Sequence, residues 1–305
     1  MILSVVIITY NEEANIGRTL ASVQPLVADG KGEIIVVDSG STDRTVEIVT
    51  LFGAKVFVEE WKGYAAQKNL AIDKASGDWI LSLDADEEVN TELSQALHDT
   101  LEGLERYAEL GKATDTCAHR LTLSDAKDDI EYHIGTKLDE QFAGFWIPRK
   151  NEFIGRWIRR GGFWPDTKLR FFRRGSGKFE NRAVHEDVQI QGKTGTIRYG
   201  ALLHHSYPTL SDYLDHMNRY SSLGAEMIVA KGLVRFSAFN ILVRPLATFI
   251  YNYIFRLGFL DGREGLLLHL YHAVYVSWKY AKAWELAHQR QKQKQNPPFG
   301  GNDKN

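Results

Sequence analysis

The chain has 305 residues, 44% of them hydrophobic and 25% charged, which excludes a disordered protein and predicts a sizeable core in roughly two domains. Its single cysteine, Cys117, excludes an intramolecular disulfide framework and a zinc site built from several cysteines, and it suits a reducing compartment. Residues 1–140 hold 12 Lys and Arg against 27 Asp and Glu, whereas residues 141–200 hold 13 against 5 and residues 201–305 hold 12 against 7. The acidic part suits a cation and the basic part a phosphorylated or membrane-bound partner, although merely solvated faces explain any single stretch equally well.

Short apolar runs in the first 90 residues predict buried strands. They occupy residues 3–10, 33–38, 55–60 and 78–84. Continuous runs rich in β-branched residues are typical of strands that are covered on both faces. No basic segment precedes the first run, so we expect no signal peptide.

Helices are predicted between these strands. The first follows Asn11, a candidate N-cap, the second lies around residues 46–52, and the third covers residues 64–75 with Gly77 as its C-cap. Buried strands that alternate with helices form a parallel sheet through right-handed crossovers. The expected fold class is therefore α/β, with a Rossmann-like, mainly parallel sheet flanked by helices.

The rest of the chain has a different composition. Residues 92–110 continue as a helix, and residues 111–143 are polar and acidic and suggest a loop-rich insertion. Residues 145–174 are rich in Trp, Arg and Gly and predict short strands and turns. From Ser211 the pattern is helical and aromatic, and residues 289–305 are of low complexity and are expected to be disordered.

Polar side chains follow three of the predicted strands. They are Thr9, Asn11 and Glu12 after the first strand, Asp38 at the end of the second and Asp84 at the end of the fourth. Because ligands of an open parallel sheet bind at the carboxyl ends of its strands, we expect these side chains to converge on one site. No G-x-G-x-x-G follows the first strand and no P-loop motif is present, which weighs against dinucleotide-binding and P-loop proteins.

The stretch LSLDADEE, residues 81–88, predicts a metal site. Asp84 and Asp86 are one residue apart directly after a buried strand, where both carboxylates can face one divalent cation. Mg²⁺ and Mn²⁺ prefer such oxygen ligands and keep positions for phosphate oxygens. An isolated D-x-D is common on surfaces, but its place at a strand end, with Asp38 two strands earlier, favours a metal ligand.

Three blocks of the N-terminal part together resemble family 2 of the inverting glycosyltransferases, which have the GT-A fold. They are VVIITYNEE, IIVVDSGSTDRT and GYAAQKNLAIDKASGDWILSLDADEE, and they cover residues 3–90. The later stretch resembles the lipopolysaccharide-core β-glucosyltransferase branch, in which an aromatic, basic run ends in a Val-His-Glu triplet, here Val184, His185 and Glu186. Residues 111–143 depart from the usual spacing.

The resemblance implies contacts with a nucleotide-sugar. Thr9, Asn11 and Glu12 match the loop that lies against a uracil-like base, and Asp38 matches the acid that binds the base or the ribose. A UDP-sugar is therefore the expected donor.

The resemblance also implies a divalent cation, Mg²⁺ or Mn²⁺. Asp84 matches the first acid of the metal motif, near the ribose and the donor sugar, and Asp86 matches the residue that binds the metal. Gln67 and Lys68 match helix positions that flank the nucleotide. For these two residues a solvated helix face is the alternative.

The resemblance assigns the general base to Glu186, with Asp187 as the runner-up. Inversion in one step needs a carboxylate that takes the proton of the acceptor hydroxyl, while a cation neutralises the leaving diphosphate. His185 is expected beside this base or as a further metal ligand, and a merely packed histidine is the alternative.

Basic and aromatic residues alternate in the stretch that follows the insertion. Arginine forks bind phosphate and indole rings cover the apolar face of a pyranose, so we expect a phosphorylated glycan or glycolipid acceptor. The candidate acceptor-binding residues are Trp157, Arg159, Trp164, Arg170 and His185. His204, His205 and Tyr207 are expected in the same cleft, and simple packing is the alternative for them. The same composition can bind single-stranded nucleic acid, but the donor half favours a sugar acceptor, and no nucleic-acid partner is expected.

The C-terminal region predicts contact with a membrane surface. Its apolar runs, residues 245–255 and 266–278, are shorter than the ~20 residues of a membrane-spanning helix. Within residues 234–284, aromatic side chains alternate with three arginines that suit anionic headgroups: Arg235, Arg244 and Arg256. An ordinary helical subdomain or a homodimer interface is the alternative.

These observations predict a metal-dependent glycosyltransferase that moves a hexose, glucose by the resemblance, from a UDP-sugar to a cell-envelope glycolipid. Lipopolysaccharide inner core, on the cytoplasmic face of the membrane, is the expected acceptor, and another lipid-linked glycan or a polysaccharide is the alternative. A nucleotidyltransferase and a non-catalytic nucleotide-sugar binder represent other classes. The expected domains are a catalytic GT-A domain over residues 1–210, with a nucleotide-sugar half (1–90) and an acceptor half (144–210), and a helical region over 211–288.

Overall fold

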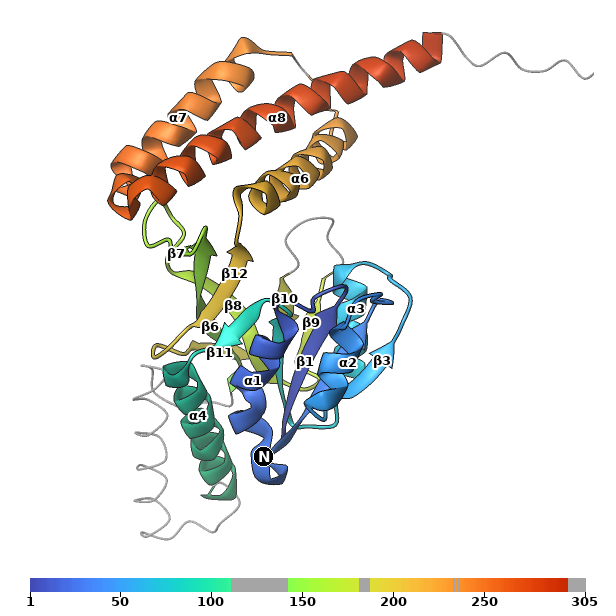
Figure 1. The fold of residues 1–305 in the computed structure, drawn as a ribbon, viewed down its shortest axis with the longest axis vertical. Coiled ribbons are helices and arrows are strands. Elements are labelled where there is room, and N and C mark those ends of the chain that lie inside the picture. The colour runs from blue at the N-terminus through green and yellow to red at the C-terminus, as the bar shows by residue number, and fades with distance from the viewer. Residues whose placement is uncertain (111–141, 181–186, 233, 235, 296–305) are drawn as a thin grey trace, which may run out of the picture. The chain divides into compact units, whose positions relative to one another are not determined.

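The structure, a computed structural model, describes residues 1–110, 142–180, 187–232, 234 and 236–295 (Figure 1). It contains two compact units. The first comprises Met1–Asn151 and Pro165–His205, and the second comprises Glu152–Trp164 and Ser206–Asn305. The expected domain boundary at residue 210 stays a prediction, and the segment Glu152–Trp164, expected in the acceptor half, belongs to the helical second unit.

One sheet of ten strands carries most of the β-structure of the described residues. Its order is β3-β2-β1-β4-β8-β6-β12-β5, and β7 and β11 both pair with β6. The strands are β1 (Leu3–Thr9), β2 (Gly32–Asp38), β3 (Lys55–Val58), β4 (Trp79–Asp84), β5 (Glu87–Val89), β6 (Phe142–Phe153), β7 (Arg156–Trp157), β8 (Asp166–Arg173), β11 (Lys193–Thr196) and β12 (Leu202–Tyr207). A separate antiparallel pair is formed by β9 (Gly177–Phe179) and β10 (Val188–Ile190).

The first four strands form the parallel arrangement that the apolar runs predict. β1 pairs in parallel with β2 and β4, and β2 pairs in parallel with β3. Thr9 lies opposite Asp38 and Ile8 lies opposite Asp84, so the strand ends that carry polar side chains share one edge. The α/β class is confirmed, and beyond β4 the strands β8 and β6 continue the sheet in antiparallel orientation.

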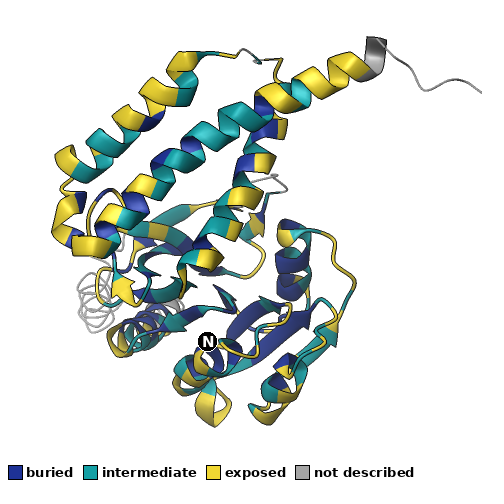
Figure 2. Ribbon diagram, turned by 45° about the horizontal axis from the view of Figure 1, so that its top comes forward, coloured by how far each residue is buried: buried dark blue, intermediate teal, exposed yellow. Residues whose placement is uncertain are grey.

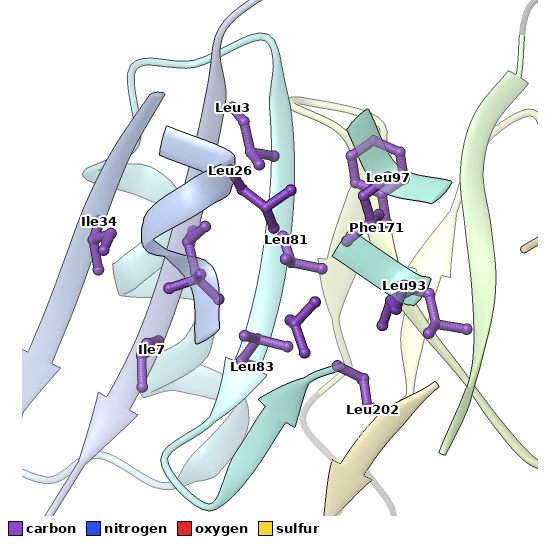
Figure 3. Packing of buried hydrophobic residues seen from close by; sticks show 14 of the residues in the cluster. Leu3, Ile7, Leu26, Ile34, Leu81, Leu83, Leu93, Leu97, Phe171 and Leu202 are labelled. Carbon is purple, nitrogen blue, oxygen red and sulfur yellow. The ribbon is translucent and has the colours of Figure 1, made fainter. Parts of the chain in front are cut away.

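Helices cover both faces of the parallel strands, which Figure 2 shows as mostly buried. Alternate side chains of β1 point to opposite faces, as a strand requires. Leu3 and Ile7 join a cluster with side chains of α1 (Ile16–Val27), α2 (Thr45–Leu51) and α4 (Thr91–Leu110), part of which Figure 3 shows. Val6 joins a second cluster with α3 (Tyr64–Asp73). Truncating one such buried leucine to alanine costs about 2–5 kcal/mol.

Two predicted helix caps are wrong. The first helix begins at Ile16, and Asn11 instead adopts a left-handed φ of 54° while its side-chain oxygen accepts a hydrogen bond from Thr42 N at 2.8 Å. The third helix ends at Asp73, and Gly77 is required for another reason. A Cβ at Gly77 would lie 2.8 Å from Ile2 O and 2.9 Å from Ser4 N, so close backbone approach explains this glycine.

The second unit is built from helices, as the pattern after Ser211 predicts. They are α6 (Leu210–Ala230), η2 (Phe239–Val243), α7 (Arg244–Ile250), η3 (Tyr251–Phe255), η4 (Gly258–Asp261) and α8 (Gly262–Gln295). α6 begins with a capping box between Thr209 and Asp212. Phe153, Tyr213 and Leu268 are the centre of the core of this unit.

Two further predictions concern the C-terminal tail and the insertion at residues 111–143. α8 continues to Gln295, so the prediction of disorder is wrong for residues 289–295, and residues 296–305 lie outside the described residues. Most of the predicted insertion, residues 111–141, also lies outside them. Among the described helices, none has the length and hydropathy needed to cross a membrane.

Candidate active site

The loop that follows β2 is organised around Asp38. Asp38 is 1% exposed, and its Oδ1 accepts hydrogen bonds from Gly40 N at 2.9 Å and Ser41 N at 2.8 Å. Its Oδ2 accepts from the hydroxyls of Thr9, at 2.9 Å, and Ser41. Four donors therefore stabilise the carboxylate and fix the loop beside the end of β1. A contact of Asp38 with a base or ribose stays a prediction.

Glu12, which follows β1, belongs to an acidic cluster with Asp84 and Asp86. Burial raises the pKa of Glu12, the hydrogen bond from Asn15 Nδ2 lowers it, and the nearby negative charges of Asp86 and Asp84 raise it again. Three carboxylates from two neighbouring strand ends thus gather as the parallel topology predicts. Such a cluster is suited to a positively charged ligand.

Gln67 and Lys68 lie on α3, and both are buried rather than solvated. Gln67 Nε2 donates to Ser39 Oγ at 3.1 Å, whereas the buried Gln67 Oε1 accepts no hydrogen bond among the described residues. An unpaired buried acceptor costs about 1–3 kcal/mol, so Gln67 Oε1 is suited to a donor from a ligand. Lys68 Nζ contacts Asp84 Oδ1 at 2.7 Å and lies 5.2 Å from the centre of the Phe179 ring.

Asp84, at the end of β4, is held between two cations. Lys68 Nζ contacts one carboxylate oxygen, and Arg170 Nη2 donates to the other. Burial by itself raises the pKa of Asp84, but the charges of Arg170 and Lys68 outweigh it and hold the pKa well below its ordinary value. Both carboxylate oxygens therefore have a cationic partner, and the role of Asp84 as a second metal ligand stays a prediction.

Arg170, predicted to bind the acceptor, is 5% exposed and bridges two carboxylates. Its Nη2 donates to Asp84 and also to Glu87 Oε1, at 3.0 Å. The fully buried Glu87 accepts a second bond at 3.0 Å from Arg149 Nη1, and Arg149 Nη2 donates to Asp166 Oδ2 at 2.7 Å. These five residues and Lys68 form a charge network. Arg170 belongs to this network, which corrects its assignment to the acceptor.

Asp86 faces His204 after the turn that ends β4. Asp86 Oδ2 is 3.3 Å from His204 Nε2, and His204 Nδ1 is 2.8 Å from Asn151 Oδ1. The Asn151 amide is oriented by its Nδ2, which donates to Asp166 Oδ2 at 3.0 Å. Because Asn151 therefore presents its oxygen to His204, a neutral His204 carries its hydrogen on Nδ1, and the lone pair of Nε2 faces Asp86.

Backbone contacts hold Asp86 and His204 in place. The peptide N–H of His205 donates to Asp86 O at 3.1 Å, and the Thr19 hydroxyl of α1 donates to Ala85 O at 2.7 Å. β12 pairs antiparallel with β5, which places His204 opposite Glu87. Strand pairing therefore brings a histidine from late in the chain to the end of β4.

This arrangement fits a divalent cation. A lone pair and a carboxylate oxygen that face each other repel unless a proton or a cation lies between them. Burial raises the pKa of Asp86, but when a proton lies between the two groups, the charge and the hydrogen bond of His204 outweigh this effect and lower the pKa, so the Asp86 carboxylate is ionised. Adjacent ligands of an octahedral Mg²⁺ are about 3 Å apart, close to the separation of the two atoms. Asp86 and His204 are thus the residues suited to hold Mg²⁺ or Mn²⁺.

Of the remaining candidates for acceptor binding and for the general base, three belong to the second unit, one is exposed, and two lie outside the described residues. Trp157, Arg159 and Trp164 lie in the second unit. The two indole rings meet edge to face with their centres 5.1 Å apart, and the Arg159 guanidinium is 4.4 Å from the Trp157 ring. Asp187 is exposed, and its carbonyl accepts from Glu180 N at 3.2 Å. His185 and Glu186 lie outside the described residues.

Comparison with known proteins identifies the family of this chain. Residues 4–177, more than half of the chain, match the family described as glycosyl transferase family 2. The chain belongs to this family. It is a glycosyltransferase with an α/β fold of the GT-A type.

Similar proteins include other bacterial glycosyltransferases. The chain is 29% identical, over 93% of its length and 92% of the relative's, to the lipopolysaccharide core biosynthesis glycosyltransferase LpsC of Rhizobium meliloti. It is 30% identical to an uncharacterized glycosyltransferase of Rickettsia felis, over 87% of this chain and 83% of that one. Glucosyl-3-phosphoglycerate synthase from Mycobacterium tuberculosis, solved with Mn²⁺ and UDP, is 29% identical over 33% of this chain and 39% of that chain, with a TM-score of 0.29.

Two residues of this glycosyltransferase site, Glu87 and Asn151, were not predicted, whereas Arg149 belonged to the basic acceptor stretch and His204 was expected only in the acceptor cleft. Glu87 was part of the quoted acidic run, and Arg149 of the basic one, but no spacing signal pairs them. Asn151 and His204 are 53 residues apart and meet because β6 and β12 are neighbours in the sheet. The sequence signal that was available is the pair of consecutive histidines, His204 and His205, which in the structure face Asp86 and Glu88.

Proposed function

We propose that this glycosyltransferase is metal-dependent and inverting. We further propose that it transfers a hexose, with glucose as the first candidate, from a UDP-sugar to a cell-envelope glycolipid. The observation that carries the proposal is the pair of Asp86 and His204, 3.3 Å apart at the carboxyl edge of the parallel strands. The similarity to LpsC supports lipopolysaccharide core as the acceptor, which implies action at the cytoplasmic face of the inner membrane.

Donor binding is proposed at the strand ends of the first unit. The loop fixed by Asp38 offers a surface for the base and the ribose, and the unpaired Gln67 Oε1 offers a buried acceptor for an N–H or hydroxyl of the nucleotide. Asp86 and His204 would hold Mg²⁺ or Mn²⁺, which when bound supplies positive charge to the leaving diphosphate. Asp84, oriented by Lys68 and Arg170, is proposed to contact the ribose and the sugar.

The proposed reaction is a single displacement. The acceptor hydroxyl oxygen forms a bond to the anomeric carbon while the bond from that carbon to UDP breaks, and UDP leaves with the electron pair. A carboxylate takes the hydroxyl proton, and we assign this role to Glu186, with Asp187 as the runner-up. The position of Phe179, which shortly precedes Glu186 in the chain, supports this assignment. Phe179 exchanges two hydrogen bonds with Asn69, and Asn69 is next to Lys68 on α3.

Acceptor recognition is proposed for the aromatic and basic residues of the second unit. Trp157 and Trp164 present indole rings suited to a pyranose face, and Arg159 beside them is suited to a phosphate. His185 is proposed to contribute as well. Another lipid-linked glycan or a polysaccharide has the same chemistry and is the alternative acceptor.

Two measurements test the proposal. UDP release from a panel of UDP-hexoses, with and without Mn²⁺ or Mg²⁺, identifies the donor, and formation of a nucleotide-sugar from a sugar phosphate would instead indicate a nucleotidyltransferase. Donor binding without any turnover would indicate a non-catalytic binder. Mass spectrometry of core oligosaccharide from cells with and without the gene should show the loss of one hexose and of any residues beyond it. An unchanged core would move the proposal to another glycan.

Glu186→Gln tests the general base. The variant keeps the shape and removes the basicity, so turnover should fall about 10²-fold or more while UDP affinity is nearly unchanged. Asp187→Asn is the matched control and should have a much smaller effect. Normal turnover of Glu186→Gln together with an inactive Asp187→Asn would move the base by one residue. A loss of stability without a loss of rate would indicate a structural ion pair.

A further inference from the structure

The second unit exposes apolar side chains that a folded protein usually buries. Six phenylalanine, leucine and isoleucine side chains on and after η2 are at least half exposed, up to 73% for Phe255. We call them the apolar surface: Phe239, Leu242, Leu246, Ile254, Phe255 and Leu260. In Figure 2 the segment that contains α7 and the turn after it is largely coloured as exposed. Exposed apolar surface of this extent marks an interaction site.

The helical segment from η2 to η3 packs on the protein with one face, and its other face is not covered by any of the described residues. Phe239, Leu242, Leu246 and Ile254 are all exposed along this segment, in which the π-helices η2 and η3 flank α7. The packed face lies against α8: Pro245 is buried, and Ser277 of α8 donates to Ile241 O at 3.0 Å. The segment therefore has an outer face that is apolar instead of polar.

The charges around the apolar surface have one sign. Residues 231–260 contain one lysine and three arginines and no Asp or Glu. The two acids that follow are not free, since Asp261 is 3% exposed and accepts hydrogen bonds from Arg159 N and Arg160 N, while Glu264 pairs with Arg156 at 3.4 Å. The surface thus presents cations beside apolar groups, and the neighbouring carboxylates are turned to internal partners.

A shallow cavity of about 470 Å³ is lined by apolar side chains and by polar or charged ones. It is lined by Phe239, Arg244, Ala247, Thr248, Tyr251 and Asn252. The Arg244 guanidinium also lies 5.1 Å from the centre of the Tyr280 ring, which holds it against the helix. A cation, a hydroxyl and an amide at the edge of apolar side chains are suited to an anionic lipid headgroup whose acyl chains lie beside it.

We infer that the apolar surface docks the protein on an anionic phospholipid bilayer without crossing it. Phenylalanine, leucine and isoleucine side chains enter the boundary between headgroups and acyl chains, and Arg244 and Arg256 meet lipid phosphates. This inference stands on the second unit alone and does not depend on the chemistry at the strand ends.

A second copy of the chain is a poorer match for the same surface. In a two-fold symmetric interface the patch meets itself, so Arg244 and Arg256 of one copy would approach those of the other. Because residues 231–260 contain no carboxylate that could pair with these arginines, their positive charges would be brought together in a contact without water. An anionic bilayer supplies the complementary charge that a copy lacks.

Flotation of the full chain with vesicles tests the inference. Vesicles of phosphatidylcholine with phosphatidylglycerol should carry the protein, and vesicles of phosphatidylcholine alone should carry much less, because they lack the anionic headgroups that attract arginine. Leu246→Glu with Ile254→Glu should reduce flotation by about tenfold or more, since both carboxylates would enter the interface. Leu51→Glu is the matched control, because Leu51 is 77% exposed on α2 of the first unit, and it should leave flotation unchanged.

Three results would overturn the inference. They are absence of flotation of the unmodified chain with either vesicle, equal flotation of the double variant, or a dimer by light scattering that the double variant dissociates while no vesicle binding occurs. The last result would assign the apolar surface to a second copy. Circular dichroism of each variant shows that the fold is retained, as expected for substitutions at exposed positions.

Discussion

Two regions of the molecule depart from the usual distribution of side chains, and they do so in opposite ways. One is the carboxyl edge of the parallel strands, and the other is the apolar surface of the second unit. In the first region, Glu87 and Arg170 are buried although they are charged. In the second, Leu242 and Phe255 are exposed although they are apolar. Burial of charge is expensive and is tolerated where ions compensate one another, whereas exposure of apolar groups is tolerated where a partner covers them. The two departures therefore indicate a chemical site in one unit and a docking surface in the other.

The difference also concerns rigidity. Each group of the charge network has a defined partner, so Asp84 and Arg149 are held at fixed positions next to Asp86 and His204. Such preorganisation is what a site needs in order to stabilise a developing charge. The lipid docking that we infer for the apolar surface requires no exact geometry, because a lipid interface is fluid and binding to it depends on buried apolar area and on charge.

The largest expected effect comes from breaking the charge network. Arg170→Leu leaves Glu87 and Asp84 with one cation fewer in a buried environment, and loss of one partner of a buried ion pair costs about 3–5 kcal/mol. Urea denaturation of the purified protein should report this loss in the free energy of unfolding. Arg44→Leu is the control, because Arg44 pairs with Glu47 on the surface, and surface changes usually stay within about 0.5 kcal/mol. Equal stability of the two variants would show that the network does not hold the site.

A smaller effect is expected from Asn151→Leu, which removes the partner of His204 Nδ1. Groups that orient a metal ligand typically change metal affinity or activity by about 10–100-fold when they are lost. The divalent cation concentration for half-maximal UDP release should rise accordingly, while maximal turnover at saturating cation is largely retained. Gln95→Leu, an exposed change on α4, should leave the curve unchanged. If Asn151→Leu lowers turnover without moving the cation requirement, Asn151 does not act through His204.

Acid should distinguish the two units further. In the second unit His269 is 1% exposed, and neither ring nitrogen has a hydrogen-bond partner among the described residues. Burial lowers the pKa of His269 from the ordinary 6.5 to about 4. Between these values the unfolded chain binds the proton and the folded chain does not, so stability falls as pH drops through this window.

The expected size of this effect is about 2 kcal/mol of unfolding free energy between pH 7 and pH 5. His269→Leu should flatten this dependence, and a change at the exposed His288 should not. Asp166 of the charge network behaves differently: burial raises its pKa, but the charge of Arg149 and the hydrogen bond from Asn151 outweigh this and lower it to about 2 from the ordinary 3.8. Its contribution is therefore lost only at lower pH, between these two values. A stability curve of His269→Leu identical to that of the unmodified chain would contradict the assignment.

Much of the fold and part of the site were predictable from local patterns. The four apolar runs became β1 to β4, and Thr9, Asp38 and Asp84 lie at their ends, because a parallel sheet brings consecutive strand ends to one edge. What local patterns do not contain is the antiparallel half of the sheet. β8 and β12 bring Arg170 and His204 to Asp84 and Asp86 through pairings between residues that are far apart in the sequence.

The errors have the same origin. Asn11 suits an N-cap by its residue type, but tertiary hydrogen bonds to the Ser39–Thr45 loop hold it in a left-handed conformation instead. Arg170 suits an exposed phosphate ligand by its neighbours, but strand register directs it to Glu87. In both cases a long-range contact overrides a local preference, which a single sequence does not display.

The central claim is that Asp86 holds a divalent cation that the transfer reaction requires. UDP release by the unmodified chain, Asp86→Ala and His204→Ala, each titrated with Mn²⁺ and with EDTA, measures it most directly. The account predicts that release by the unmodified chain depends on the cation and that it falls about 10²-fold or more in both variants, with the fold retained and with Asp73→Ala, an exposed acid on α3, unaffected. Full activity in EDTA, or full activity of Asp86→Ala, would contradict the claim.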